Sequence, residues 1–370
     1  MANQSNGCNT NKTTVSMQAY RSLLYQLFYT QLPMNLLHCV FYKVKSDFFQ
    51  LSRSVQIAFL SAIGFALFVC WDQSHFWQTR EDYGFGFIVP FFVGYVIFDR
   101  WPAMKSLLLG KSASVEYLNA PQTGFSPMVA SLFFSFMCMG GLLFLLLGGS
   151  LRASTGPSHP GTVSLALGFA AYLLGLAYLV SQVDVQGRFI PVKARLHFTA
   201  LFLFPALIWL ISAPMLSIVE TKIKVFLLGK VVSVVLIIFD VLGFPIEQQG
   251  NVLILPTGNV GVADACSGIR SLTACIFAGS FLAAVFLDRF WKKLSMVLLA
   301  MLLAFLTNIL RSLFLTAWAY NNGSGSIDGA VHDIAGYAVL GITCLGLIAL
   351  LPLFNLKVSK DSDFLEHDLD

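Results

Sequence analysis

Eight long apolar blocks constrain the fold of this chain more than any other feature of its sequence. Each block is roughly 17–25 residues long, the length that an α-helix needs to cross about 30 Å of hydrocarbon. Only 11% of the 370 residues are charged and 56% are hydrophobic, whereas soluble domains carry about 25% charged residues. We therefore expect an all-α polytopic membrane protein with about eight transmembrane helices. The expected spans are residues 55–71, 84–98, 126–149, 161–182, 196–217, 266–287, 294–319 and 332–353.

The expected spans divide the chain into four parts. Residues 1–54 form an N-terminal cytoplasmic segment without the apolar core of a cleavable signal peptide, so the first span is expected to be an uncleaved targeting signal. Residues 55–195 hold the first transmembrane helices, and residues 196–353 hold the later ones. Residues 354–370 end in the acidic run DSDFLEHDLD and are expected to be a solvated cytoplasmic tail.

Basic residues predict which ends of the spans are cytoplasmic, because short cytoplasmic loops are enriched in Lys and Arg. The segment before the first span is basic, and so are the loops at residues 99–125, 183–195 and 289–293. The chain is expected to lie in the cell inner membrane. With the basic loops inside, residues 218–265 must begin and end on the outer face.

This outer segment has two local features. Residues 225–243 are apolar but are interrupted by Lys230 and Asp240, which leaves a run too short to span a membrane. We expect an interfacial or re-entrant helix here, and a ninth span is the alternative. Residues 251–263, NVLILPTGNVGVA, place two β-branched runs around a Pro-Thr-Gly-Asn turn. This pattern predicts a small β-hairpin on the outer face.

The first polar block lies at the outer start of the sixth span. Cys266 would lie near a helix N-terminus, where backbone amides stabilise a thiolate, and Arg270 follows one turn later on the same face. A buried, inert cysteine beside an arginine that anchors the helix at the headgroups is the alternative. The seven cysteines are scattered, without CxxC or metal-ligand spacing. We therefore expect no disulfide framework, no metal site and no cofactor.

Two more polar blocks follow in the next two spans. Asn308 and Arg311 share a helix face, and Arg311 would lie about 12 Å inside the outer end of its span. An arginine at that depth is costly unless it faces a cavity or a partner, although snorkelling to the headgroups would also accommodate it. His332 opens the last span from the outside. It could act as a general acid or base, or it could cap the helix at the interface.

Together the three blocks place a cysteine, an arginine and a histidine on consecutive spans at the outer face. A Cys–His pair with a cationic oxyanion stabiliser is sufficient for acyl transfer through a thioester. A small transporter or flippase that uses Arg311 to bind an anionic substrate is the alternative, although it has no chemical need of Cys266. A non-catalytic membrane scaffold is a third possibility. No basic run interleaved with aromatic residues is present, so nucleic acid is not an expected partner.

The same three blocks resemble the signature blocks of the exosortase/archaeosortase family. They read ACSGIRSL at residues 265–272, NILRSLFL at 308–315 and VHDIAGYAVL at 331–340, and the resemblance covers roughly residues 200–353. It implies an extracytoplasmic cysteine transpeptidase whose catalytic region is residues 196–353. Such an enzyme processes exported proteins that carry a C-terminal sorting signal, made of a motif such as Pro-Glu-Pro, an apolar helix and a basic tail.

The resemblance also implies roles for individual residues. Cys266 would be the nucleophile and Arg311 the essential arginine of the second block. His332 stands where bacterial members have histidine and archaeal members tend to have arginine, which favours a bacterial exosortase. We assign Arg270 and Asn308 to substrate binding. An amine or hydroxyl acceptor would resolve the thioester, and no metal or cofactor would take part. The protein would be in contact with membrane lipid.

Overall fold

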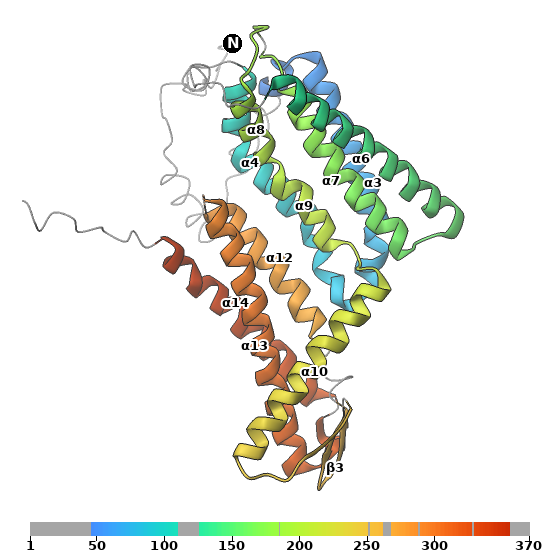
Figure 1. The fold of residues 1–370 in the computed structure, drawn as a ribbon, viewed down its shortest axis with the longest axis vertical. Coiled ribbons are helices and arrows are strands. Elements are labelled where there is room, and N and C mark those ends of the chain that lie inside the picture. The colour runs from blue at the N-terminus through green and yellow to red at the C-terminus, as the bar shows by residue number, and fades with distance from the viewer. Residues whose placement is uncertain are drawn as a thin grey trace, which may run out of the picture. The chain divides into compact units, whose positions relative to one another are not determined.

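The structure is a computed structural model, and it describes residues 46–109, 126–184, 186–250, 252–261, 268–287, 289–327 and 329–355. Contacts group the chain into two units, Met1–Ser52 and Arg53–Asp370. All elements labelled in Figure 1 belong to the second unit. The expected cytoplasmic segment, residues 1–54, and the expected acidic tail, residues 354–370, lie largely outside the described residues.

Helices account for most of the described chain. The first half contains α3 (Arg53–Thr79), the 3-10 helix η1 (Glu81–Ile88), α4 (Val89–Leu108), α6 (Pro127–Thr155), α7 (His159–Val180), α8 (Val192–Leu201) and α9 (Leu203–Ser212). The second half contains α10 (Ser217–Val241), α12 (Ile269–Phe286), α13 (Phe290–Asn322), the 3-10 helix η3 (Ser324–Ile327) and α14 (Ala330–Asn355).

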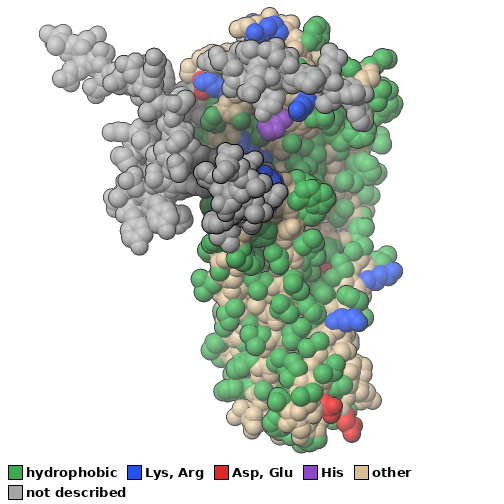
Figure 2. Space-filling model, turned by 60° about the vertical axis from the view of Figure 1, so that its left-hand side comes forward, with side chains coloured by type: hydrophobic (Ala, Val, Ile, Leu, Met, Phe, Trp, Pro, Cys, Tyr) green, Lys and Arg blue, Asp and Glu red, His purple; other side chains and the backbone are tan. Residues whose placement is uncertain are grey.

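Among the described residues, eight helical segments are long and apolar enough to cross a membrane. They are Arg53–Thr79, Glu81–Leu108, Pro127–Thr155, His159–Val180, Val192–Ser212, Ile269–Phe286, Phe290–Asn322 and Ala330–Phe354. Each overlaps one expected span, so the predicted all-α polytopic membrane fold is confirmed. Figure 2 shows hydrophobic side chains over most of the described surface on one face, as expected for helices that contact lipid.

The fifth span is interrupted at the junction of α8 and α9. Pro205 has no N–H, so it cannot donate to the carbonyl of Leu201 four residues earlier. Arg100 on α4 donates to that carbonyl instead. Its second terminal nitrogen donates to the carbonyl of Ala284 in α12, at 3.3 Å. One arginine therefore holds α4, the interrupted fifth span and α12 together.

Glycines allow α6 and α7 to pack with their backbones in contact. A Cβ atom added at Gly141 would lie 2.4 Å from the backbone nitrogen of Tyr172. One added at Gly168 would lie 2.7 Å from the backbone nitrogen of Leu145. Small residues at such positions are typical of membrane helix pairs, where close van der Waals packing drives association.

A small antiparallel sheet follows α10. Its strands are β1 (Glu247–Gln249), β2 (Val252–Leu255) and β3 (Gly258–Gly261), in the order β1-β2-β3. Leu255 pairs with Gly258 across a two-residue connection. The predicted hairpin is therefore confirmed, and a third strand extends it.

α10 covers the part of α13 that extends past α12. Leu228, Val231 and Val235 of α10 belong to a buried cluster that also contains Leu315 and Ala319 of α13. Figure 1 shows α10 and β3 beyond the end of α12, beside α13 and α14. α10 is not among the eight candidate spans of the described chain, so the ninth-span alternative gains no support. Its expected interfacial position stays a prediction.

Candidate active site

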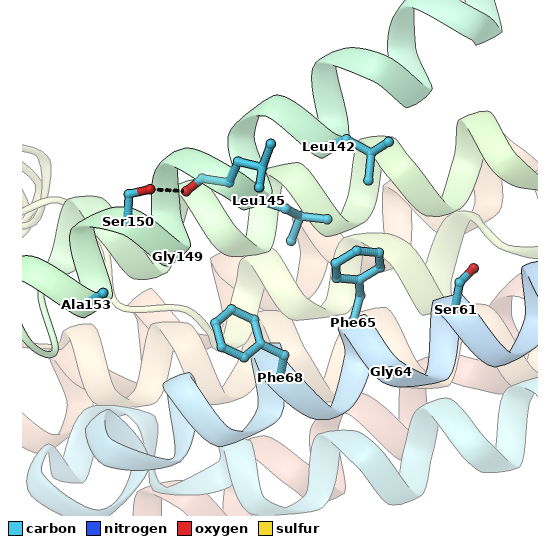
Figure 3. A pocket seen from close by; sticks show the side chains of 10 residues that line it. Ser61, Gly64, Phe65, Phe68, Leu142, Leu145, Gly149, Ser150 and Ala153 are labelled. Carbon is cyan, nitrogen blue, oxygen red and sulfur yellow. Dashed lines mark hydrogen bonds between the residues drawn. The ribbon is translucent and has the colours of Figure 1, made fainter.

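One cavity is an apolar groove between α3 and α6, with a volume of about 870 Å³. Figure 3 shows Phe65 and Phe68 on α3 opposite Leu142 and Leu145 on α6. The described residues that line the groove include no titratable side chain. The groove can hold an apolar chain, but its described walls offer no acid or base that could activate a nucleophile.

A second cavity, of about 400 Å³, lies where η1, α12, α13 and α14 meet. Arg270, Arg311 and His332 line it together with Gly268. The structure thus brings described residues of all three sequence blocks to one cavity. Cys266 lies outside the described residues, two positions before Gly268 in the sequence. Further lining residues include Glu81, Asp82, Phe85, Ser271, Asp333, Gly336 and Tyr337.

Arg311 and His332 are in direct contact in this cavity. Nη2 of Arg311 is 2.9 Å from Nε2 of His332 and 3.5 Å from the His332 carbonyl oxygen. Because a guanidinium can only donate, Nε2 is the acceptor, and a neutral imidazole then carries its proton on Nδ1. Nδ1 lies 3.5 Å from Oδ1 of Asp333. The imidazole ring is therefore oriented by charged groups on both sides.

The local sequence of α14 makes room for this contact. Gly336 follows His332 by one helical turn, and a Cβ atom added there would lie 3.4 Å from Nη2 of Arg311. Nε of Arg311 is buried and has no hydrogen-bond partner among the described residues. The planar guanidinium fork suits carboxylates and oxyanions. Arg311 therefore has one buried donor, Nε, without an acceptor among the described residues.

Gly268 begins α12 with a left-handed backbone, at a φ of 64°. A Cβ atom added there would lie 2.9 Å from Nδ2 of Asn308. The Asn308 side chain is buried and is not among the described residues that line the cavity. Asn308 thus lies against the start of α12, and its assignment to substrate binding stays a prediction.

η1 supplies an acidic wall that the sequence analysis missed. Arg270 forms an ion pair with Glu81, and its Nε lies 3.6 Å from Oδ1 of Asp82. Thr273 Oγ1 lies 3.0 Å from the Asp82 carbonyl oxygen, within hydrogen-bonding distance, so η1 and α12 are in contact here. Two adjacent acidic residues at the start of an apolar span were visible in the sequence. Their basic partner lies 189 residues further along, and nothing in the spacing indicates that the two segments meet.

A second polar cluster adjoins this wall. Arg80 donates two hydrogen bonds to Glu220, at the start of α10, and lies 3.6 Å from Asp82. The bonds to Glu220 raise the pKa of the Arg80 guanidinium, although burial acts in the opposite direction. His159 Nδ1 is 2.8 Å from the Met215 carbonyl oxygen, and its Nε2 is 3.5 Å from Arg80. The cluster joins α7, α10 and η1 beside the cavity.

Fold and site together define a multi-pass membrane protein with an arginine–histidine contact between its last two spans. Residues 77–349 match the family described as transmembrane exosortases, and the chain belongs to this family. The match begins well before residue 200, where the resemblance was expected to start. No curated protein and no solved structure matched the chain.

Membership of this family supports one of the predicted functions. Exosortases are membrane protein-sorting transpeptidases that act on exported proteins with C-terminal sorting signals. A transporter, a flippase or a passive scaffold gains no support from this assignment. The matched region also runs across residue 195 without interruption, and the division of the chain at that position stays a prediction.

Proposed function

We propose that this protein is a cysteine transpeptidase of the cell inner membrane. It cleaves C-terminal sorting signals of the Pro-Glu-Pro type from exported proteins, on the extracytoplasmic face. The main supporting observation is the 2.9 Å contact between Arg311 and His332 in a cavity that Gly268 also lines. Cys266, two positions before Gly268 in the sequence, supplies the nucleophile.

In the first half-reaction, the Cys266 thiolate attacks the backbone carbonyl carbon at the sorting motif. Negative charge develops on the carbonyl oxygen, and Arg311 donates hydrogen bonds to it. Collapse of the tetrahedral intermediate breaks the C–N bond and leaves a thioester on Cys266. His332 protonates the leaving amine, which departs with the membrane-anchored tail of the substrate.

The contact between Arg311 and His332 imposes an order on these steps. Nε2 of His332 accepts a hydrogen bond from Arg311, so it cannot take up a proton while this contact lasts. The substrate carbonyl must therefore draw Arg311 away first. Nε2 then accepts the proton of the Cys266 thiol and later delivers it to the leaving amine. Substrate binding thus activates the nucleophile.

In the second half-reaction, an amine or hydroxyl acceptor attacks the thioester. A C–N or C–O bond forms as the C–S bond breaks, and the acceptor's proton passes through His332 to the sulfur of Cys266. The scheme uses no metal and no cofactor.

The test is processing of a co-expressed substrate that carries the motif, an apolar helix and a basic tail. Cys266→Ala and Cys266→Ser are expected to abolish the shift in substrate mobility, because neither side chain can form the thioester. Cys344→Ser is the matched control, since Cys344 is an exposed residue of α14 that does not line the cavity. Immunoblots of the membrane fraction measure whether all variants insert equally. Processing at the parent rate by Cys266→Ala would exclude the thioester mechanism.

A further inference from the structure

Two neighbouring carboxylates of η1 share one arginine but are held differently. The Glu81 side chain is 79% exposed, and its ion-pair partner within the described chain is Arg270. The Asp82 side chain is 22% exposed and lies 3.6 Å from both Arg270 Nε and Arg80 Nη2. Neither carboxylate has a part in the acyl transfer proposed above.

The contacts around Asp82 fix its position. Its carbonyl oxygen lies 3.0 Å from Oγ1 of Thr273 in α12, within hydrogen-bonding distance. The next residue, Tyr83, is fully buried, and its hydroxyl accepts a hydrogen bond from the backbone nitrogen of Met215 at 3.0 Å. Arg80, on the other side, is held by Glu220. The backbone that carries the Asp82 carboxylate is therefore held in place beside Arg270.

The contact of Glu81 with Arg270 is different in kind. Both side chains are mostly exposed, at 79% for Glu81 and 62% for Arg270. Ion pairs with this exposure contribute little free energy, because water screens them and the long side chains lose entropy. A guanidinium fork can bind a carboxylate through two parallel hydrogen bonds. Another carboxylate can therefore displace Glu81 from the guanidinium of Arg270.

We propose that Glu81 is a displaceable internal ligand of Arg270. An acidic side chain of the bound polypeptide takes its place in the cavity, while Asp82 acts as a positioning residue that keeps the guanidinium oriented. This inference rests on the proposed function, since it requires a polypeptide substrate in the cavity. It predicts that loss of charge at the two neighbouring carboxylates has opposite effects on substrate binding.

The experiment measures binding without turnover, in the full-length protein carrying Cys266→Ala. Two fluorescent peptides, centred on Pro-Glu-Pro and on Pro-Gln-Pro, are titrated by fluorescence anisotropy in detergent. Glu81→Gln is expected to tighten binding of the Glu peptide about 1.4- to fivefold, the range for an exposed ion pair, and to leave the Gln peptide unchanged. Asp82→Asn is expected to weaken binding of the Glu peptide. Arg270→Gln should remove the difference between the two peptides.

Glu247→Gln is the matched control, because Glu247 is an exposed residue of β1 outside the cavity. Weaker binding of the Glu peptide by Glu81→Gln would overturn the inference, and so would an equal change for both peptides. It also fails if no variant binds either peptide. The proposed function is judged separately, by the Cys266 processing assay in cells, so the two failures are distinguishable.

Discussion

Arg311 lies level with the start of α12, because both line the same cavity. α12 has 18 residues and α13 has 33, which correspond to lengths of about 27 Å and about 50 Å. α13 continues past Arg311 to Asn322, and Leu315 and Ala319 in this part pack against α10 and the sheet. The depth of Arg311 expected from the sequence, about 12 Å inside the outer end of its span, stays a prediction.

Substitution of Arg311 separates an oxyanion donor from a snorkelling anchor. Arg311→Lys keeps the charge but loses the planar fork of donors. Removal of one oxyanion donor lowers a rate about 10²–10³-fold, and we expect a loss of this size in substrate processing. Arg311→Leu is expected to insert at least as well as the parent and to be inactive. The measurement is the initial rate of processing, normalised to the amount of enzyme in the membrane.

The matched control is Arg289→Lys, at an exposed arginine that immediately precedes α13. Its processing rate should equal that of the parent. Lysine snorkels as well as arginine, so a near-parental rate for Arg311→Lys would favour the anchor and remove the proposed oxyanion donor from the site.

Sequence spacing predicted only part of the candidate site. Arg270, Arg311 and His332 could be assigned to one face because the basic loops predict that each lies toward the outer end of a consecutive span. The contact of Gly268 with Asn308 was not predictable, because it depends on how α12 and α13 are rotated about their axes. Helical periodicity shows which residues of one helix share a face, but not which residue of another helix that face meets. For the same reason, the sequence did not show that Glu81 meets Arg270.

At the scale of elements, the existence of the spans was predictable and their internal breaks were not. Apolar runs specify transmembrane helices because hydrocarbon leaves backbone groups no other partners. The second span begins with η1 rather than with an α-helix, and Gly86 in η1 lies against the indole of Trp77. A Cβ atom at that position would come within 2.2 Å of the ring nitrogen. Such a tertiary contact leaves no trace in local hydropathy.

The glycine contacts between α6 and α7 predict that alanine substitutions at two adjacent positions of α6 have different effects on stability. Gly141→Ala forces the two backbones apart, because its Cβ would lie 2.4 Å from the Tyr172 nitrogen. Overpacking of this kind costs about 1–3 kcal/mol, so we expect a lower midpoint of thermal unfolding in detergent. Gly140→Ala on the same helix is the control. Nothing lies within 4 Å of a Cβ atom there, and alanine favours helix. Equal midpoints for the two variants would contradict the close packing of this pair.

At the scale of the whole molecule, orientation in the membrane is the main untested prediction. Gln249, in the sheet, is expected on the outer face, and Arg289 on the cytoplasmic face. A cysteine at position 249 should react with a membrane-impermeant maleimide in intact cells, above the background of the parent protein. One at position 289 should react only after the membrane is disrupted. Both are exposed positions, so accessibility within the protein does not limit the reaction. The reverse pattern would show that the chain is inverted.

The role of Arg100 has a consequence for biosynthesis. Its carbonyl partner Leu201 is made 101 residues after it, and Ala284 is made 184 residues after it. At about 5–20 residues per second, roughly 10–40 s pass between synthesis of the cation and synthesis of its last acceptor. Throughout this time the guanidinium of Arg100 in the newly inserted α4 lacks these two acceptors, so it must stay hydrated or extend to the headgroups. The N-terminal helices therefore leave the ribosome as an unfinished assembly, and α12 completes their hydrogen bonding after it has emerged.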